Sequence, residues 1–142
     1  MEETHVSLSV DCLLNEDSYA IPLYQRNFSW TYDEIEQLLN DVADSFQEKR
    51  DNYYIGTLVV NEENGLFKII DGQQRTTALN LIALVLKNEF DFNKLEAVNL
   101  TFPARRKSNE NIQKLFIKEK ISEDDENELT RGYGHARSEE RR

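Results

Sequence analysis

The sequence feature that most constrains the fold is an apolar segment that runs from about Gln74 to Phe90. Its apolar residues recur at helical spacing, and others fall between them, so the predicted helix is apolar on more than one face. A helix of this kind is buried inside a protein rather than lying on its surface. The segment therefore predicts a central helix against which the other elements pack.

The composition indicates one ordinary globular domain that does not bind DNA over its whole surface. The chain has 142 residues, of which 39% are hydrophobic and 31% charged, and its net charge is -10. Broad contact with phosphate needs clustered lysine and arginine, which an acidic chain does not offer. No apolar run reaches the roughly 18 residues that predict a membrane span. The acidic N-terminus does not resemble a secretion signal, so we expect a cytoplasmic protein without membrane partners.

Two further elements are predicted before the apolar segment. Thr31 and Glu34 have the spacing of a capping box, and the apolar spacing behind them predicts a helix from about Tyr32 to Lys49. The residues from Tyr53 to Ile70 predict a hairpin of two strands, with a turn at Gly65. The helix carries an acidic surface, because most charged residues of this region are aspartate or glutamate.

The pattern becomes weaker after Phe92. The segment AVNLTF is compatible with a short strand, and a helix with Ile112, Leu115 and Phe116 on its inner side follows Pro103. The tail after Ile121 is polar and offers neither a cap nor a closing apolar element. We therefore divide the chain into a core at residues 1–100 and a helical extension at residues 101–142, which we expect to begin a further region.

The junction IIDGQQRTT, which precedes the central helix, has more polar chemistry than a turn requires. The N-terminus of a helix presents N–H groups and the positive end of the helix dipole, which attract anions. Gly72 permits close approach of a ligand, Arg75 supplies a planar cation, and Thr76 and Thr77 supply hydroxyl groups. The alternative is purely structural, with Asp71 as a helix cap and Arg75 on the surface. The residues alone leave both interpretations open.

A second polar segment, IPLYQRNFSW, spans Ile21 to Trp30. It contains the pair Gln25 and Arg26 among aromatic residues, which are able to stack on a nucleobase, and Arg26 is able to face the same anion as Arg75. The alternative is that the aromatic residues belong to the core and that Arg26 is solvated.

These segments, in this order, resemble the N-terminal domain of the GmrSD type IV restriction enzymes. The resemblance rests on IPLYQRNFSW, YYIGTLVV and IIDGQQRTTALNLI, and it covers the chain best from about Val6 to Phe92. It implies an α+β fold of the ParB/sulfiredoxin-like type, in which a small mixed sheet packs with helices and a hairpin precedes a strand–turn–helix phosphate site. It also implies a set of phosphate-site residues, to which we add Thr77 from the junction: Gln25, Arg26, Gly56, Thr57, Asp71, Gly72, Gln73, Gln74, Arg75 and Thr76.

The function implied by this resemblance is binding of a nucleoside triphosphate (NTP) with Mg²⁺, and its hydrolysis. Arg75 and Arg26 would offset phosphoryl charge, and Gln73 or Gln74 would position the attacking water. Asp71 would orient water or metal, or hold Arg26. Full-length relatives join this part to a C-terminal His-Asn-His-type nuclease domain that cuts modified phage DNA. That domain or subunit is absent from this chain, so we expect no nuclease activity from it.

Three alternatives to hydrolysis stay open. The chain could be a module that senses nucleotide or recognises DNA without turnover, a ParB-like nuclease in its own right, or an interaction scaffold. A nuclease would nick DNA in a metal-dependent way. The net negative charge of the chain disfavours this alternative, and two histidines are too few for a histidine-metal nuclease centre.

Overall fold

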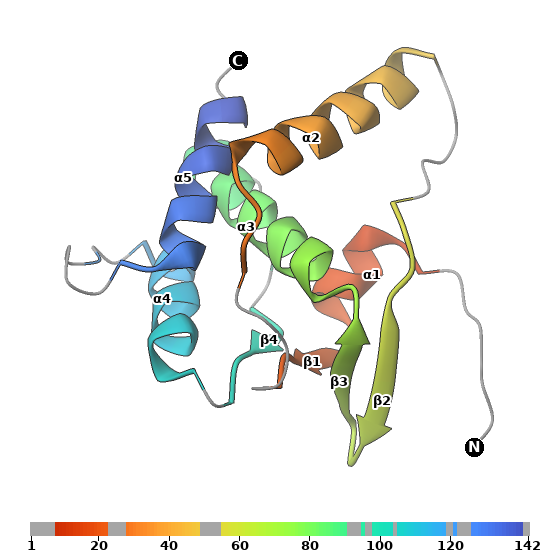
Figure 1. Cartoon of the computed structure of the whole chain (residues 1–142), viewed down its shortest axis with the longest axis vertical. Coiled ribbons are helices and arrows are strands. Elements are labelled where there is room, and N and C mark those ends of the chain that lie inside the picture. Colours follow the sequence, from red (N-terminus) through yellow and green to blue (C-terminus); the bar gives the residue numbers. More distant parts are fainter. Residues whose placement is uncertain are drawn as a thin grey trace.

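A computed structural model describes residues 8–22, 28–48, 55–90, 95, 98–103, 105–118, 121 and 126–140 (Figure 1). The described residues form a mixed α+β fold, which confirms the predicted class. Its sheet has the strand order β2-β3-β1-β4, in which β2 and β3 are antiparallel and β1 is parallel to both β3 and β4. The elements are α1 (Val10–Asn15), β1 (Ser18–Ala20), α2 (Tyr32–Gln47), β2 (Val59–Glu63), β3 (Leu66–Asp71), α3 (Gln73–Phe90), β4 (Leu100–Thr101), α4 (Arg106–Phe116) and α5 (Glu128–Glu140).

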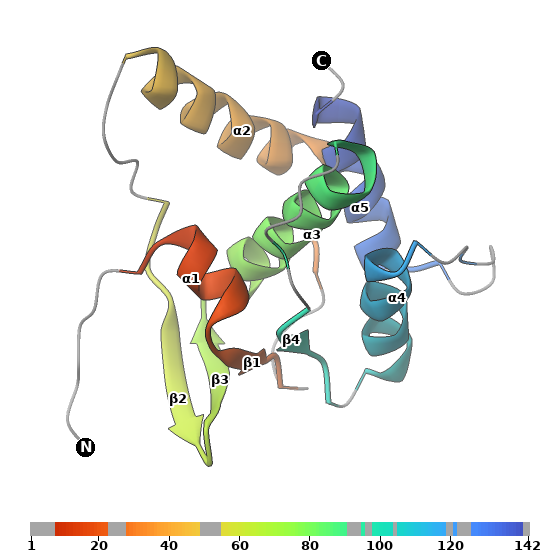
Figure 2. The ribbon, with the colours of Figure 1, turned by 180° about the vertical axis from the view of Figure 1, so that it is seen from behind.

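The central helix is α3, as its pattern predicted. Ten of its residues are buried, and it packs against α5, which in turn packs against α2. Seen from behind, α1 and β1 lie on the near side of α3 (Figure 2). Leu13 of α1, Leu84 of α3 and Leu129 of α5 belong to one buried cluster. The interior of the fold is thus organised around this helix.

The predicted hairpin is confirmed, although its first strand is shorter than expected. β2 begins at Val59, residues 55–58 precede it without strand structure, and Tyr53 and Tyr54 lie outside the described residues. Asn64 and Gly65 both have positive φ, at 53° and 83°. Two successive residues of this kind give a tight turn whose twist matches the flanking strands.

Helix α2 starts where the capping pattern predicted. Glu34 Oε2 accepts hydrogen bonds from the N–H of Thr31 at 2.8 Å and from its hydroxyl at 2.6 Å. Ile35 and Leu38 of the predicted inner stripe are buried, but Val42 is 40% exposed. The expectation that the whole stripe faces inward is therefore wrong at Val42, although Ser45 further along the helix is buried.

Helix α5 corrects the expectation that the tail has no cap and no apolar element. Asn127 Oδ1 accepts a hydrogen bond from the N–H of Leu129 at 3.1 Å, which is N-cap geometry. Leu129 and Ala136 are completely buried. The division at residue 100 stays a prediction, since an extension can also pack on a core. Among the helices of the described ranges, none combines the length and the apolar character needed to cross a membrane.

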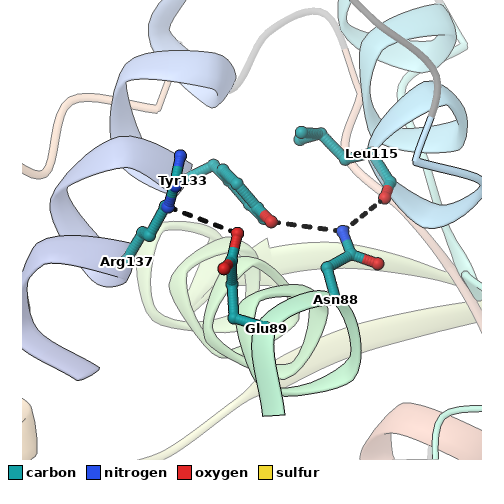
Figure 3. Close-up of polar contacts among 5 residues, drawn as sticks. All are labelled: Asn88, Glu89, Leu115, Tyr133 and Arg137. Carbon is teal, nitrogen blue, oxygen red and sulfur yellow. Dashed lines mark hydrogen bonds and ion pairs between the residues drawn. The ribbon is translucent and has the colours of Figure 1, made fainter. Parts of the chain in front are cut away.

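Polar side chains at the end of α3 bind the end of α4 and also α5 (Figure 3). Asn88 Nδ2 donates to the carbonyl of Leu115 at 2.7 Å and to the hydroxyl of Tyr133 at 3.2 Å. Lys87 Nζ donates to the carbonyl of Phe116 at 2.6 Å. Carbonyl groups in the last turn of a helix lack partners within the helix, so these donors stabilise the end of α4.

Replacing Asn88 with alanine is expected to lower the free energy of unfolding by about 1–3 kcal/mol, because a part-buried carbonyl loses its shorter hydrogen bond and a hydroxyl loses a donor. Urea denaturation followed by circular dichroism measures the change. The control is Asn40→Ala on the exposed face of α2, which should change the value by less than about 0.5 kcal/mol. Equal effects of the two substitutions would contradict the contacts at Asn88.

Candidate functional site

The candidate site is formed where strand β3 turns into helix α3. Asp71 is the last residue of the strand and is exposed, and Gly72 has a φ of +100°. The first helical hydrogen bond runs from the N–H of Thr76 to the carbonyl of Gly72, at 3.0 Å. The N–H groups of Gln73 and Arg75 therefore lie ahead of the helical ladder, where an N-terminus attracts anions.

Gly72 brings this turn against the segment that precedes strand β2. A β-carbon on Gly72 would lie 3.0 Å from Thr57 O and 3.1 Å from Leu58 Cδ1. Both the positive φ and this close approach favour glycine at the position. The structure thus places Thr57 and Leu58 against the turn, while the role of Gly56 and Thr57 at a phosphate site stays a prediction.

Arg75 points its guanidinium at Gly56. A β-carbon built on Gly56 would meet Arg75 Nη1 and would lie 2.6 Å from Arg75 Cζ. Gly56 also has a φ of +149°, which side chains rarely adopt. The absent side chain leaves room for the arginine, so the guanidinium lies beside the backbone of a neighbouring segment while the residue stays partly exposed.

Gln74, in contrast, is only 7% exposed. Its Oε1 accepts a hydrogen bond from the N–H of Ser29 at 2.7 Å, and the Ser29 hydroxyl lies at 3.4 Å. Ser29 belongs to the second polar segment of the sequence. The two segments therefore meet at the start of α3, although Gln25 and Arg26 lie outside the described residues and their roles stay predictions.

The remaining predicted residues differ in accessibility. Gln73 is partly exposed at the first position of α3. Thr76 and Thr77 are 4% and 1% exposed, and the Thr76 carbonyl accepts from Asn80 Nδ2 at 3.0 Å. Their side chains lie in the interior, so the accessible surface at the turn is made by Asp71, Gln73 and Arg75.

An open cleft of about 390 Å³ adjoins Arg75, on the side of α2. Its lining is mixed, because it includes apolar side chains, Arg75 and polar side chains of α2, carboxylates among them. Trp30 and Ile55 come from the segments that precede α2 and β2. The residues around the cleft are Trp30, Asp33, Glu34, Gln37, Leu38, Asp41, Ile55 and Arg75.

The carboxylates of the cleft have different roles. Hydrogen bonds from the hydroxyl and then the N–H of Thr31 lower the pKa of the Glu34 carboxyl, so this group stays ionised as the cap of α2. Asp41 Oδ1 accepts a hydrogen bond from Gln37 Nε2 at 2.7 Å. Within the described ranges, no group of three or more histidine, cysteine, aspartate or glutamate residues is arranged to hold a metal ion.

The α2 side of this cleft was not predicted from the sequence. Asp33, Gln37 and Asp41 recur every four residues, which places them on one face of the helix. That spacing was a usable signal, but the acidic residues were interpreted only as a charged surface. Placing this face beside Arg75 depends on tertiary packing, which a local pattern does not encode.

The described fold and site define a small α+β domain with an arginine-containing strand–turn–helix junction. The family model of the GmrSD restriction endonuclease, N-terminal domain, matches residues 10–141. The chain belongs to this family, which confirms the resemblance and makes it a component of a GmrSD-type restriction system. A search of curated proteins found no matching relative.

Proposed function

We propose that this chain binds and hydrolyses a nucleoside triphosphate as the N-terminal domain of a GmrSD-like system that restricts phage DNA in the cytoplasm. The observation that carries the proposal is the placement of the Arg75 guanidinium over Gly56, next to the N-terminus of α3. A planar cation and a helix N-terminus both favour a phosphate group. Cleavage of DNA is assigned to a His-Asn-His-type nuclease domain or subunit outside this chain.

In this proposal the phosphates lie at the turn itself. Gly72 lets the backbone approach them, and Arg75 offsets the charge that develops on the phosphoryl oxygens. Mg²⁺ commonly binds to phosphates together with only one or two carboxylates, so the exposed Asp71 is a sufficient protein ligand. The bound metal would neutralise phosphate charge.

The two glutamines have separate roles. The Oε1 atom of Gln74 already accepts from Ser29, whereas Gln73 is partly exposed at the start of the helix. We assign to Gln73 the orientation of the attacking water. The water oxygen bonds to the terminal phosphorus, its proton passes to an oxygen of the transferred phosphate, and the bond to the bridging oxygen breaks. Nucleoside diphosphate and inorganic phosphate then leave.

Replacing Arg75 with alanine tests the proposal. Isothermal titration calorimetry with each of the four common NTPs and Mg²⁺ should show saturable binding to the parent. Affinity should fall about 10- to 100-fold in Arg75→Ala, because a charge-assisted bidentate contact is lost. Release of phosphate, measured with a coupled colour assay, should fall with it.

The matched control is Arg106→Ala. Arg106 lies on α4, its side chain is 89% exposed, and it pairs with Glu110 at 2.8 Å. This variant loses the same charge far along the chain from the turn and should bind NTP as the parent does. A parent that binds no NTP, or an Arg75→Ala variant that binds like the parent, would refute the proposal. Binding without release of phosphate would show a nucleotide sensor in place of an NTPase.

A further inference from the structure

Gln74 is built into the fold as a buried hydrogen-bond acceptor. Its side chain is more than nine-tenths buried, and the 2.7 Å bond from Ser29 N–H joins residues 45 positions apart in the sequence. A buried amide that accepts from a backbone N–H fixes the segment to which that N–H belongs, since breaking the bond would leave buried polar groups without a hydrogen-bond partner. Gln74 therefore fixes the segment around Ser29 on α3.

The residues on either side of Ser29 extend this attachment. Phe28 is 6% exposed, and its ring lies against Gly132 of α5. Trp30, which follows Ser29, is partly buried and lines the cleft beside Arg75. Because Phe28 and Ser29 are held by α5 and α3, the backbone is fixed directly before Trp30, whose side chain packs against both buried clusters at the cleft.

The cleft suits the nucleoside end of a ligand. Its volume of about 390 Å³ falls within the range of small-molecule sites. Trp30 offers an aromatic face, and Gln37 and Asp33 offer polar atoms for ribose hydroxyls or base amino groups. The carboxylates of α2 repel phosphate, which directs the phosphates away from α2 and toward the N-terminus of α3.

We propose that Trp30 is the stacking surface for the nucleobase of the bound NTP and that Gln74 is the positioning residue that holds it there through Ser29. Two adjacent residues of α3 then position both ends of the ligand. Arg75 faces the phosphates, and Gln74 positions Trp30 against the nucleobase. This inference rests on the proposed function and extends it to the nucleoside.

The first test uses Gln74→Met, which keeps the volume of the side chain and removes the acceptor. Trp30 is the only tryptophan of the chain, so intrinsic fluorescence reports on it alone. Without ligand, quenching of Trp30 by acrylamide should rise about twofold in Gln74→Met. Affinity for the NTP should fall about tenfold by calorimetry, while circular dichroism shows a folded domain.

Ser29→Ala is the matched control. It keeps the backbone N–H that bonds to Gln74 and loses only the hydroxyl at 3.4 Å. Quenching and affinity should both stay within twofold of the parent. If Gln74→Met matches the parent in quenching and affinity, the positioning role is refuted while the result for Arg75 stands.

The second test addresses stacking directly, and decides the matter if Gln74→Met does not fold. NTP should quench Trp30 fluorescence in the parent. Trp30→Phe should retain affinity within about threefold, and Trp30→Leu should lose about tenfold. Equal affinities of these two variants, or unchanged fluorescence on binding, would refute the stacking role. A parent that binds no NTP would refute the proposed function, and this inference with it.

Discussion

Replacing Gly132 with alanine is expected to lower the free energy of unfolding by about 1–3 kcal/mol. A β-carbon at this position of α5 would meet the ring of Phe28 and would lie 2.8 Å from Leu81 Cδ1. Phe28 and Leu81 are 6% and 0% exposed, so neither has free space into which to move. Overpacking therefore outweighs the preference of about 1 kcal/mol that a helix has for alanine. Urea denaturation measures the result.

Gly134→Ala provides the control on the same helix. Nothing lies within 4 Å of a β-carbon at Gly134, and the residue is exposed. Only the higher helix propensity of alanine over glycine then matters, and the free energy of unfolding should rise by up to about 1 kcal/mol. Two variants of equal stability would contradict the packing of α5 against Phe28 and α3.

Replacing Gly56 with alanine is expected to weaken NTP binding at least about tenfold. The new methyl group would occupy the place of the Arg75 guanidinium, which lies at the end of a flexible side chain and would move away. The loss matches that of one charge-assisted contact. Calorimetry with the NTP and Mg²⁺ that bind the parent measures it.

Gly65→Ala separates displacement of Arg75 from backbone strain. Gly65 also has a positive φ, of +83°, but a β-carbon there would have no neighbour within 4 Å. Both variants carry a strain of roughly 1–3 kcal/mol, so their melting temperatures should fall by similar amounts. Only Gly56→Ala should lose affinity. Parent-like binding by Gly56→Ala would show that Arg75 does not need its place over Gly56.

Local patterns predicted the elements whose signals are strong. The many-sided apolar character of α3 gave its central position, and the Thr31–Glu34 spacing gave the start of α2. Helix α5 was difficult to predict in detail because it includes two glycines and few apolar residues. Its buried side is made by a few scattered side chains, such as Leu129 and Ala136, and their burial depends on the neighbouring helices.

The candidate site was predictable in its parts and not in its assembly. The chemistry of Asp71 to Arg75 was evident from residue types at a helix start. The resemblance assigned Gly56 and Arg75 to one site, but the approach of the Arg75 guanidinium to Gly56 was not predicted, because no local rule relates residues so far apart. The burial of Gln74 and Thr77 was not anticipated, since their polar type indicated exposure, whereas their position on the covered sides of the central helix decided the outcome.

The edge of the sheet has a consequence for how copies of this protein behave in concentrated solution. In the described sheet β2 forms one edge and the two-residue β4 the other, and an outer strand offers unpaired backbone groups to a second copy. Glu62 and Glu63 end this strand, and its ladder is irregular between Val59 and Val60. Glu63 is paired with Lys68 of β3 at 2.6 Å. Two copies pairing here would bring their Glu62 carboxylates into one short ladder, and repulsion between these groups disfavours aggregation by this route.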